Sequence, residues 1–161
     1  MYQVVRKSAL GDTYTVKERG LVHYTVKTGS FLPILNRMLG GFLILPQTFH
    51  LAEGSATLTR KPGMAKERFV YRHNEERWHF KQVVAHSYQM LVTNQHVAYE
   101  LYPILSMRQI ELRQGGVVLA KIEKVADDGS ATYEIENLAE FDEYFLTALV
   151  LAADSMIHVP Y

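Results

Sequence analysis

A stretch near the C-terminus, FLTALVLAA (Phe145–Ala153), constrains the fold more than any other part of the sequence. Eight of its nine residues are apolar, and only Thr147 is polar. A helix on a protein surface carries polar residues along one face, and this stretch has no such face. At about 1.5 Å per residue it is too short to cross the ~30 Å hydrocarbon core of a bilayer, and Asp154 closes it off. We therefore expect a helix that is buried on every side.

Polar residues before this stretch fit the start of a helix. Asn137 is followed three residues later by Glu140, which is the spacing of a capping box. Glu140, Asp142 and Glu143 would then lie in the first turns, where the helix dipole favours negative charge. The sequence therefore predicts Asn137 as the helix cap.

The rest of the chain alternates apolar and polar residues with the period of two that is typical of half-buried strands. The runs are Tyr2–Lys7, Asp12–Glu18, Leu21–Lys27, Ala56–Arg60, Glu67–Arg72, Trp78–Val84, Tyr88–Thr93, Val97–Tyr102, Met107–Arg113, Val117–Val125 and Ala131–Glu136. Turn sequences such as RKPG, RQGG and ADDGS separate them at intervals of about 8–12 residues. Together with the apolar helix, they predict a mainly β fold: a closed antiparallel β-barrel of about twelve strands around a central hydrophobic C-terminal α-helix.

One apolar segment, Ser30–Phe49, interrupts the alternation. Pro33, the Gly40–Gly41 pair and Pro46 break it, which argues against a membrane-spanning helix. We expect a loop or a short helical turn that leads into a buried strand at Phe42–Leu45. The alternative is a loop that contacts a membrane.

Length and composition indicate one globular domain, residues 1–161, because no linker or low-complexity tract divides the chain. The chain has no cysteine, which excludes disulfides, Cys-ligated metals and a thiol nucleophile. The first residues, MYQVVRKSALGDTY, show no apolar core followed by a cleavage site. We expect a cytoplasmic protein, with peripheral association at a membrane if its basic surface binds lipid.

No arrangement of side chains predicts an enzyme. The seven histidines form neither H-x-x-x-H nor H-E-x-x-H. The acidic pairs Glu75–Glu76, Asp127–Asp128 and Asp142–Glu143 fall in predicted turns or at the helix start, where solvated carboxylates are common. There is no G-x-S-x-G, P-loop or dinucleotide fingerprint. The sequence therefore predicts no catalytic residue, no cofactor and no metal.

The layout of the chain resembles that of the tubby C-terminal-like superfamily. The resemblance covers the whole chain and rests on the opening YQVVRKSALGDTYTVKERG, the many short strands and the terminal FDEYFLTALVLAADSMIH. The small bacterial and LURP-one-related members are nearest, and the phospholipid scramblase-like proteins are more distant. The resemblance implies a barrel closed around a hydrophobic C-terminal helix, and binding of phosphoinositide headgroups or another link to membranes. No phosphoinositide motif matches position by position, and Ser30–Phe49 is longer and more apolar than a strand–turn–strand of such a barrel.

The charges of the chain are unevenly distributed although they sum to zero. Residues 1–122 carry 16 Lys and Arg against 8 Asp and Glu, whereas residues 123–161 carry 1 against 9. Either the two parts neutralise each other in the folded protein, or a basic face stays free for an anionic partner.

The densest basic segment is RKPGMAKERFVYRHNEERWHFK, residues 60–81, with seven cations against three acids. The candidate anion-binding residues are Arg60, Lys61, Lys66, Arg68, Arg72, Arg77 and Lys81. Arg68 and Arg72 share a strand face because they lie an even number of positions apart. Such a surface fits an anionic lipid headgroup. A protein partner and a solvated face paired with the acidic part are alternatives, and nucleic acid is the less favoured partner.

Two functions remain. The first is a non-enzymatic binding module that docks on an anionic membrane or a protein partner through the basic face. The alternative is an open, lipocalin-like barrel that carries or converts a small apolar ligand, with the C-terminal helix packed outside. An outside helix needs a polar stripe, which Phe145–Ala153 lacks, so the helix-filled barrel is favoured.

Overall fold

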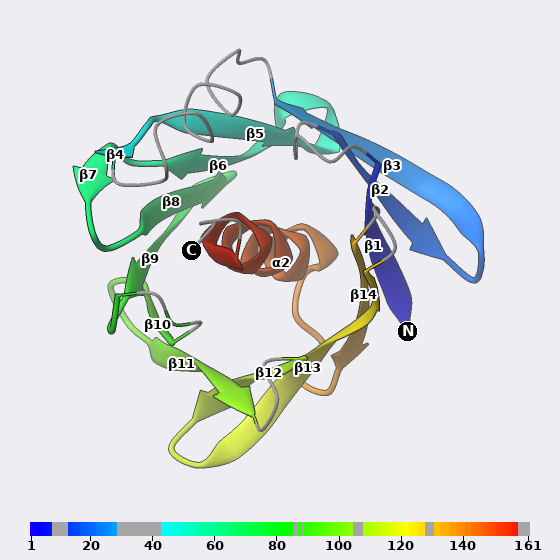
Figure 1. The fold of residues 1–161 in the computed structure, drawn as a ribbon. Helices are drawn as coiled ribbons and strands as arrows, with labels where there is room; N and C mark the ends of the chain where they lie inside the picture. Colours follow the sequence, from blue (N-terminus) through cyan, green and yellow to red (C-terminus); the bar gives the residue numbers. More distant parts are fainter. Residues whose placement is uncertain are drawn as a thin grey trace.

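Twelve strands form a closed antiparallel barrel in the computed structural model of the protein, and a helix runs through it (Figure 1). The structure describes residues 1–7, 13–28, 43–85, 87, 89–104, 108–127 and 131–157. The barrel strands are β1 (Tyr2–Arg6), β2 (Thr13–Glu18), β3 (Leu21–Thr28), β5 (Gln47–Leu51), β6 (Ala56–Arg60), β8 (Arg68–His73), β9 (Glu76–Gln82), β10 (Met90–Thr93), β11 (Ala98–Ile104), β12 (Gln109–Gln114), β13 (Val117–Asp127) and β14 (Ala131–Asn137). The other elements are β4 (Leu43–Ile44), β7 (Gly63–Met64), the 3-10 helix η1 (Ala52–Gly54) and the helix α2 (Glu143–Ile157).

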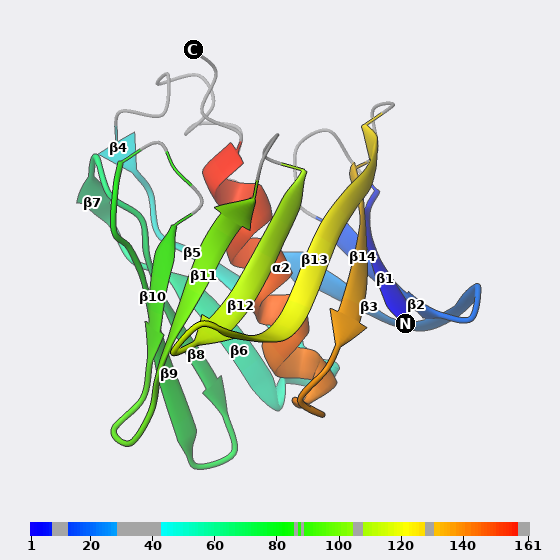
Figure 2. The ribbon, with the colours of Figure 1, turned by 90° about the horizontal axis from the view of Figure 1, so that it is seen from below.

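Strands that are neighbours in the barrel are also successive along the chain, and the first strand closes the barrel against the last. β1 pairs with β14, with Tyr2 opposite Ile135. Register shifts in the pairs β2–β3, β12–β13 and β13–β14 bend the strands and increase their twist. β4 and β7 form a separate two-stranded sheet, at the end of the barrel toward which the last turns of α2 point (Figure 2). Closure leaves the barrel without edge strands.

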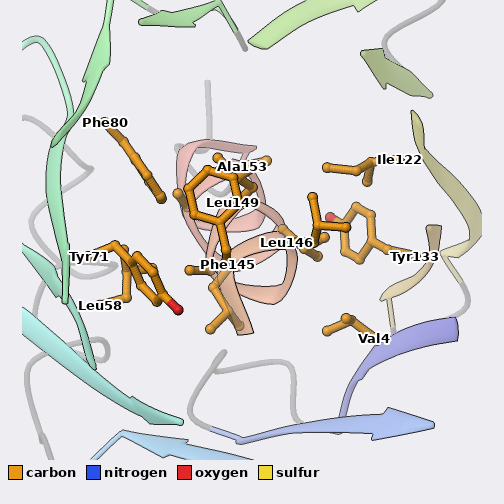
Figure 3. Close-up of a cluster of buried hydrophobic side chains, with 14 of the residues drawn as sticks. Val4, Leu58, Tyr71, Phe80, Ile122, Tyr133, Phe145, Leu146, Leu149 and Ala153 are labelled. Atoms are coloured by element: carbon orange, nitrogen blue, oxygen red, sulfur yellow. The ribbon is translucent and has the colours of Figure 1, made fainter. Parts of the chain in front are cut away.

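α2 lies inside the barrel with strands on every side (Figures 1 and 3). Leu146, Leu149 and Ala153 are fully buried. Phe145 packs against the aromatic rings of Trp78 and Tyr71, with ring centroids 4.9 and 5.8 Å apart. The predicted closed barrel around a hydrophobic C-terminal helix is confirmed.

The start of α2 differs from the predicted one. The side chain of Asp142 is the cap: its Oδ1 accepts hydrogen bonds from the N–H groups of the second and third helical residues, at 2.9 and 3.3 Å. Asn137 ends β14, and its side chain bonds to both the N–H and the carbonyl of Phe141. Glu140 lies before the helix with a φ of 55°. The prediction that Asn137 caps the helix is therefore wrong, because a nearer aspartate supplies the acceptor.

The strand expected at Phe42–Leu45 does not enter the barrel. β4 covers only Leu43–Ile44 and pairs with β7. β5 occupies this place in the barrel instead. Its residues Gln47, Phe49 and Leu51 point inward and are buried, in alternation with more exposed ones. The alternation begins directly after Pro46, so the strand that enters the barrel lies a few residues after the one that we expected. Residues 30–42, and with them the predicted loop and its membrane-contacting alternative, lie outside the described residues.

Candidate anion-binding face

The predicted basic residues meet on the hairpin β8–β9, whose register is set by a tight turn. The turn begins with Asn74, whose φ of 55° lies in the left-handed region that asparagine tolerates. This turn places Arg72 directly opposite Arg77. Four residues further along the hairpin, Arg68 lies directly opposite Lys81.

These four side chains point away from the barrel. The residues that alternate with them are directed inward and are buried: Phe69, Tyr71, Trp78 and Phe80. Because successive side chains of a strand point to opposite faces, the four cations lie on the outer face. All four are exposed to solvent.

The outer face of β8–β9 therefore carries two like-charged pairs, and on these two strands no acid lies opposite any of the four cations. Like charges directly opposite each other on two strands destabilise a sheet, by roughly 0.2–1 kcal/mol for each pair. Among the residues that the structure describes, none of the four cations forms an ion pair. The guanidinium of Arg68 donates to the carbonyl of Pro62 at 3.1 Å.

The strands on either side bring no negative charge to this face. On β6, the outer residues opposite β8 are Thr57 and Thr59. On β10, Leu91 lies opposite Lys81, and Thr93 follows two positions later. The cations of β8 and β9 thus form the charged centre of a surface four strands wide.

The pKa of His79 reports the electrostatic field at this centre. His79 lies on the outer face between Arg77 and Lys81. Burial holds its pKa below the ordinary value of 6.5, and the charges of Arg77, Lys81, Arg72 and Lys61 lower it further. The contribution of these four cations, which comes after that of burial, is consistent with their closeness to His79 on this face.

Six of the seven predicted residues belong to this surface. Lys66 is exposed beside β7, and Lys61, half-exposed, donates its backbone N–H to the carbonyl of Arg68 at 2.8 Å. We define the β8–β9 basic face as Lys61, Lys66, Arg68, Arg72, Arg77 and Lys81.

The structure does not bring Arg60 to this face. Arg60 is directed inward, is only 6% exposed, and forms an ion pair with Glu67, with its Nε donating to a carboxylate oxygen at 2.8 Å. Its direction was readable from the sequence, because Arg60 shares the face of Ala56 and Leu58 at even spacing.

An open pocket lies at the turn end of the basic face. Its lining consists of Glu75, Glu76, Arg77, His79, Asn94, Gln95 and His96. The two glutamates lie in and beside the β8–β9 turn. Acidic groups thus border the basic face at its turn end.

A second group of charged residues lies inside the barrel and was not predicted. The carboxylate of Asp154 accepts hydrogen bonds from Arg6 Nη1 at 3.2 and 3.3 Å, from the Tyr14 hydroxyl at 2.6 Å and from the Tyr133 hydroxyl. Asp154 is fully buried, so the expectation that it closes off the apolar part of the helix is wrong. Both of its oxygens already accept hydrogen bonds from protein donors, which assigns the cluster a structural role. It fixes α2 to β1, β2 and β14.

Searches for other kinds of site give negative results. In the described part of the chain, no three His, Asp or Glu side chains gather in a way that could hold a metal ion. Over the same ranges, no helix has the length and apolar character needed to cross a bilayer.

Comparisons of the chain with protein-family models, curated proteins and solved structures give no match. The resemblance to the tubby C-terminal-like superfamily therefore stays a prediction from the layout of the chain.

Proposed function

We propose that this protein is a non-catalytic docking module that binds anionic phospholipid surfaces through the β8–β9 basic face. The observation that carries the proposal is the pairing of Arg72 with Arg77 and of Arg68 with Lys81, with no ion-pair partner among the described residues. This arrangement costs stability in the free protein. An anionic surface would supply the missing countercharges and gain roughly 1 kcal/mol for each Lys or Arg close to it.

The position of α2 supports docking over the alternative of an apolar carrier. A carrier barrel keeps its interior free for the ligand. Here Leu146, Leu149 and Val150 occupy the interior. The closed twelve-stranded barrel around this helix also supports our proposal that the chain belongs to the tubby C-terminal-like superfamily.

Sedimentation with lipid vesicles tests the proposed function. We expect the protein to bind vesicles of equimolar phosphatidylcholine and phosphatidylglycerol, and not phosphatidylcholine alone. Salt should weaken this binding, because exposed charges are screened. The variant Arg72→Glu/Arg77→Glu should bind at least about thirtyfold more weakly, which corresponds to about 2 kcal/mol.

The matched control is Lys17→Glu/Arg19→Glu, which reverses the same amount of charge at the end of β2 and in the turn that follows it, away from β8 and β9 (Figure 1). Its binding should stay within about twofold of the original protein, because charges beyond a Debye length of ~10 Å are screened. Equal losses in both variants would indicate a response to net charge alone and would contradict a localised face. Binding of a protein or of nucleic acid in place of vesicles would also overturn the proposal.

A further inference from the structure

Apolar side chains are exposed at one end of the β8–β9 basic face. Met64 of β7 is 61% exposed, and Val83 and Val84, which follow β9, are 43% and 52% exposed. Apolar side chains of this size are normally found in the interior. A group of them beside a charged surface is typical of a contact site.

Backbone hydrogen bonds bring the two chain segments together. The N–H of Gln82 donates to the carbonyl of Glu67 at 2.9 Å, and the Gln82 side chain accepts from the N–H of Glu67 at 2.9 Å. Lys66 directly precedes Glu67, and Val83 directly follows Gln82, so these two residues lie next to the hydrogen-bonded pair. The N–H of Lys66 in turn donates to the carbonyl of Met64 at 2.8 Å, which folds β7 back beside this pair.

The segment after β9 is held by further hydrogen bonds. The carbonyl of Val84 accepts from the N–H and the hydroxyl of Ser87, at 3.3 and 2.9 Å. The Gln82 side chain donates to the carbonyl of Ser87 at 2.8 Å. These hydrogen bonds hold the backbone at Val84 in place, which lowers the entropy cost of binding.

Cations flank these apolar side chains. Lys66 is separated from Met64 by one residue, and Lys81 precedes Val83 by two. The Arg68 guanidinium lies at β7, because a side-chain carbon placed on Gly63 would come within 3.7 Å of it. The order along the surface is therefore apolar residues first, then Lys66, Arg68 and Lys81, and then Arg72 and Arg77.

We infer that Met64, Val83 and Val84 form an apolar edge that enters the boundary between headgroups and acyl chains of an anionic bilayer, while the neighbouring cations contact the headgroups. This inference rests on the proposed function and adds the depth and orientation of docking. Apolar side chains next to Lys and Arg are the composition of surfaces that lie in a membrane interface. Nucleic acid would pair with the cations and leave the apolar edge without a partner.

Removing the apolar edge tests the inference with the full chain. The variant Met64→Ser/Val84→Ser should bind vesicles of equimolar phosphatidylcholine and phosphatidylglycerol about tenfold more weakly, because it loses apolar burial. Its salt dependence should be unchanged, because its charges are unchanged. The matched control is Leu21→Ser/Val22→Ser on the hairpin β2–β3, where the apolar side chains are 77% and 59% exposed. Binding of the control should not change.

A fluorescent probe measures the depth directly. Because the chain has no cysteine, Val84→Cys can be labelled alone with a polarity-sensitive dye, and Leu21→Cys serves as the reference position. We expect a blue shift at position 84 on addition of the mixed vesicles, quenched by bromine on the acyl chains, and no shift at position 21.

The outcomes separate the inference from the proposed function. Salt-sensitive binding with an unshifted dye at position 84 and an unaffected serine variant would overturn the inserted edge and leave the basic face in place. Absence of binding to the mixed vesicles would overturn both. A blue shift at position 84 that is lost in Arg72→Glu/Arg77→Glu would support both.

Discussion

At the scale of single residues, Arg77 shows how the basic face opposes stability. Its cross-strand neighbour is Arg72, with no acid nearby on the outer faces of β6 and β10. We expect Arg77→Thr to raise the free energy of unfolding by about 0.2–1 kcal/mol, measured in urea, because it removes a like-charge pair. The matched control is Arg113→Thr on β12, which breaks the 2.8 Å bond from Arg113 Nε to Glu111 and should lower that free energy. A lower free energy of unfolding in both variants would contradict repulsion at Arg77.

His79 gives the basic face a dependence on pH. Its pKa lies below 6.5, chiefly because of burial and then because of the four cations around it. Protonation adds a positive charge to the face, so binding to anionic vesicles should tighten as the pH falls below about 6.5, by about fivefold for ~1 kcal/mol. In His79→Asn this gain should disappear. The comparison is His50→Asn, an exposed histidine of β5, which should keep the gain. A loss of the gain in both variants would show that His79 is not the group responsible.

At the scale of elements, the position of α2 makes the interior intolerant of charge. Leu149 is fully buried inside the barrel. Leu149→Asp should prevent folding, because an unpaired buried carboxylate costs several kcal/mol against a total stability of about 5–15 kcal/mol. Leu149→Ala should fold but lose about 2–5 kcal/mol. Fluorescence of Trp78, the sole tryptophan, follows this unfolding because the indole packs against Phe145 of α2.

The control for Leu149→Asp is Leu138→Asp, at a residue that follows β14 and is 50% exposed. This variant should fold normally, because its new carboxylate stays in water. A soluble, folded Leu149→Asp variant would contradict the placement of α2 inside the barrel.

The elements also show which parts of the fold can be read from the sequence. Period-two alternation and the apolar run of α2 identified the barrel and its contents, because both patterns are set by burial alone. The sequence pattern predicted Asn137 as the cap, and Asp142 takes this role because the chain path before α2, which local spacing does not determine, brings it to the first helical N–H groups. The role of Asp154 was hidden for a similar reason. Its partners Arg6 and Tyr14 lie at the other end of the sequence, and only the β1–β14 closure brings them together.

For the candidate site, local spacing predicted which cations of one strand share a face, but not which cations of the next strand lie opposite them. The shared face of Arg68 and Arg72 followed from their positions on one strand. Their opposition to Lys81 and Arg77 depended on the length of the Asn74 turn, which fixes the register of the hairpin. The apolar edge was not predicted, because the segments that hold Met64 and Val83 are linked through hydrogen bonds between Glu67 and Gln82, which depend on the tertiary structure.

At the scale of the whole molecule, the charges of this neutral chain differ in how they are paired. The acidic C-terminal part forms ion pairs with other strands, among them Arg6 with Asp154 and Lys121 with Glu136. The β8–β9 basic face has no such pairs within the described residues. β8 and β9 lie on the side of the barrel away from β14 (Figure 1). An exposed face of one sign can turn toward an anionic surface although the chain as a whole has no net positive charge.

The interior of the molecule predicts a fall in stability at alkaline pH. Burial raises the pKa of Tyr2, Tyr14 and Tyr71 above the ordinary value of 10.0, and for Tyr14 the charge of Asp154 adds to this effect. Their raised folded-state pKa values mean that the unfolded chain releases protons first as the pH rises above about 10. The contribution of these tyrosines to the free energy of unfolding should therefore be constant below that pH and should decrease above it, by up to about 1.4 kcal/mol per pH unit for each tyrosine. Urea unfolding followed through Trp78 measures the decrease. Tyr14→Phe should make it shallower, and a pH dependence identical to that of the original protein would contradict a neutral, buried Tyr14 hydroxyl.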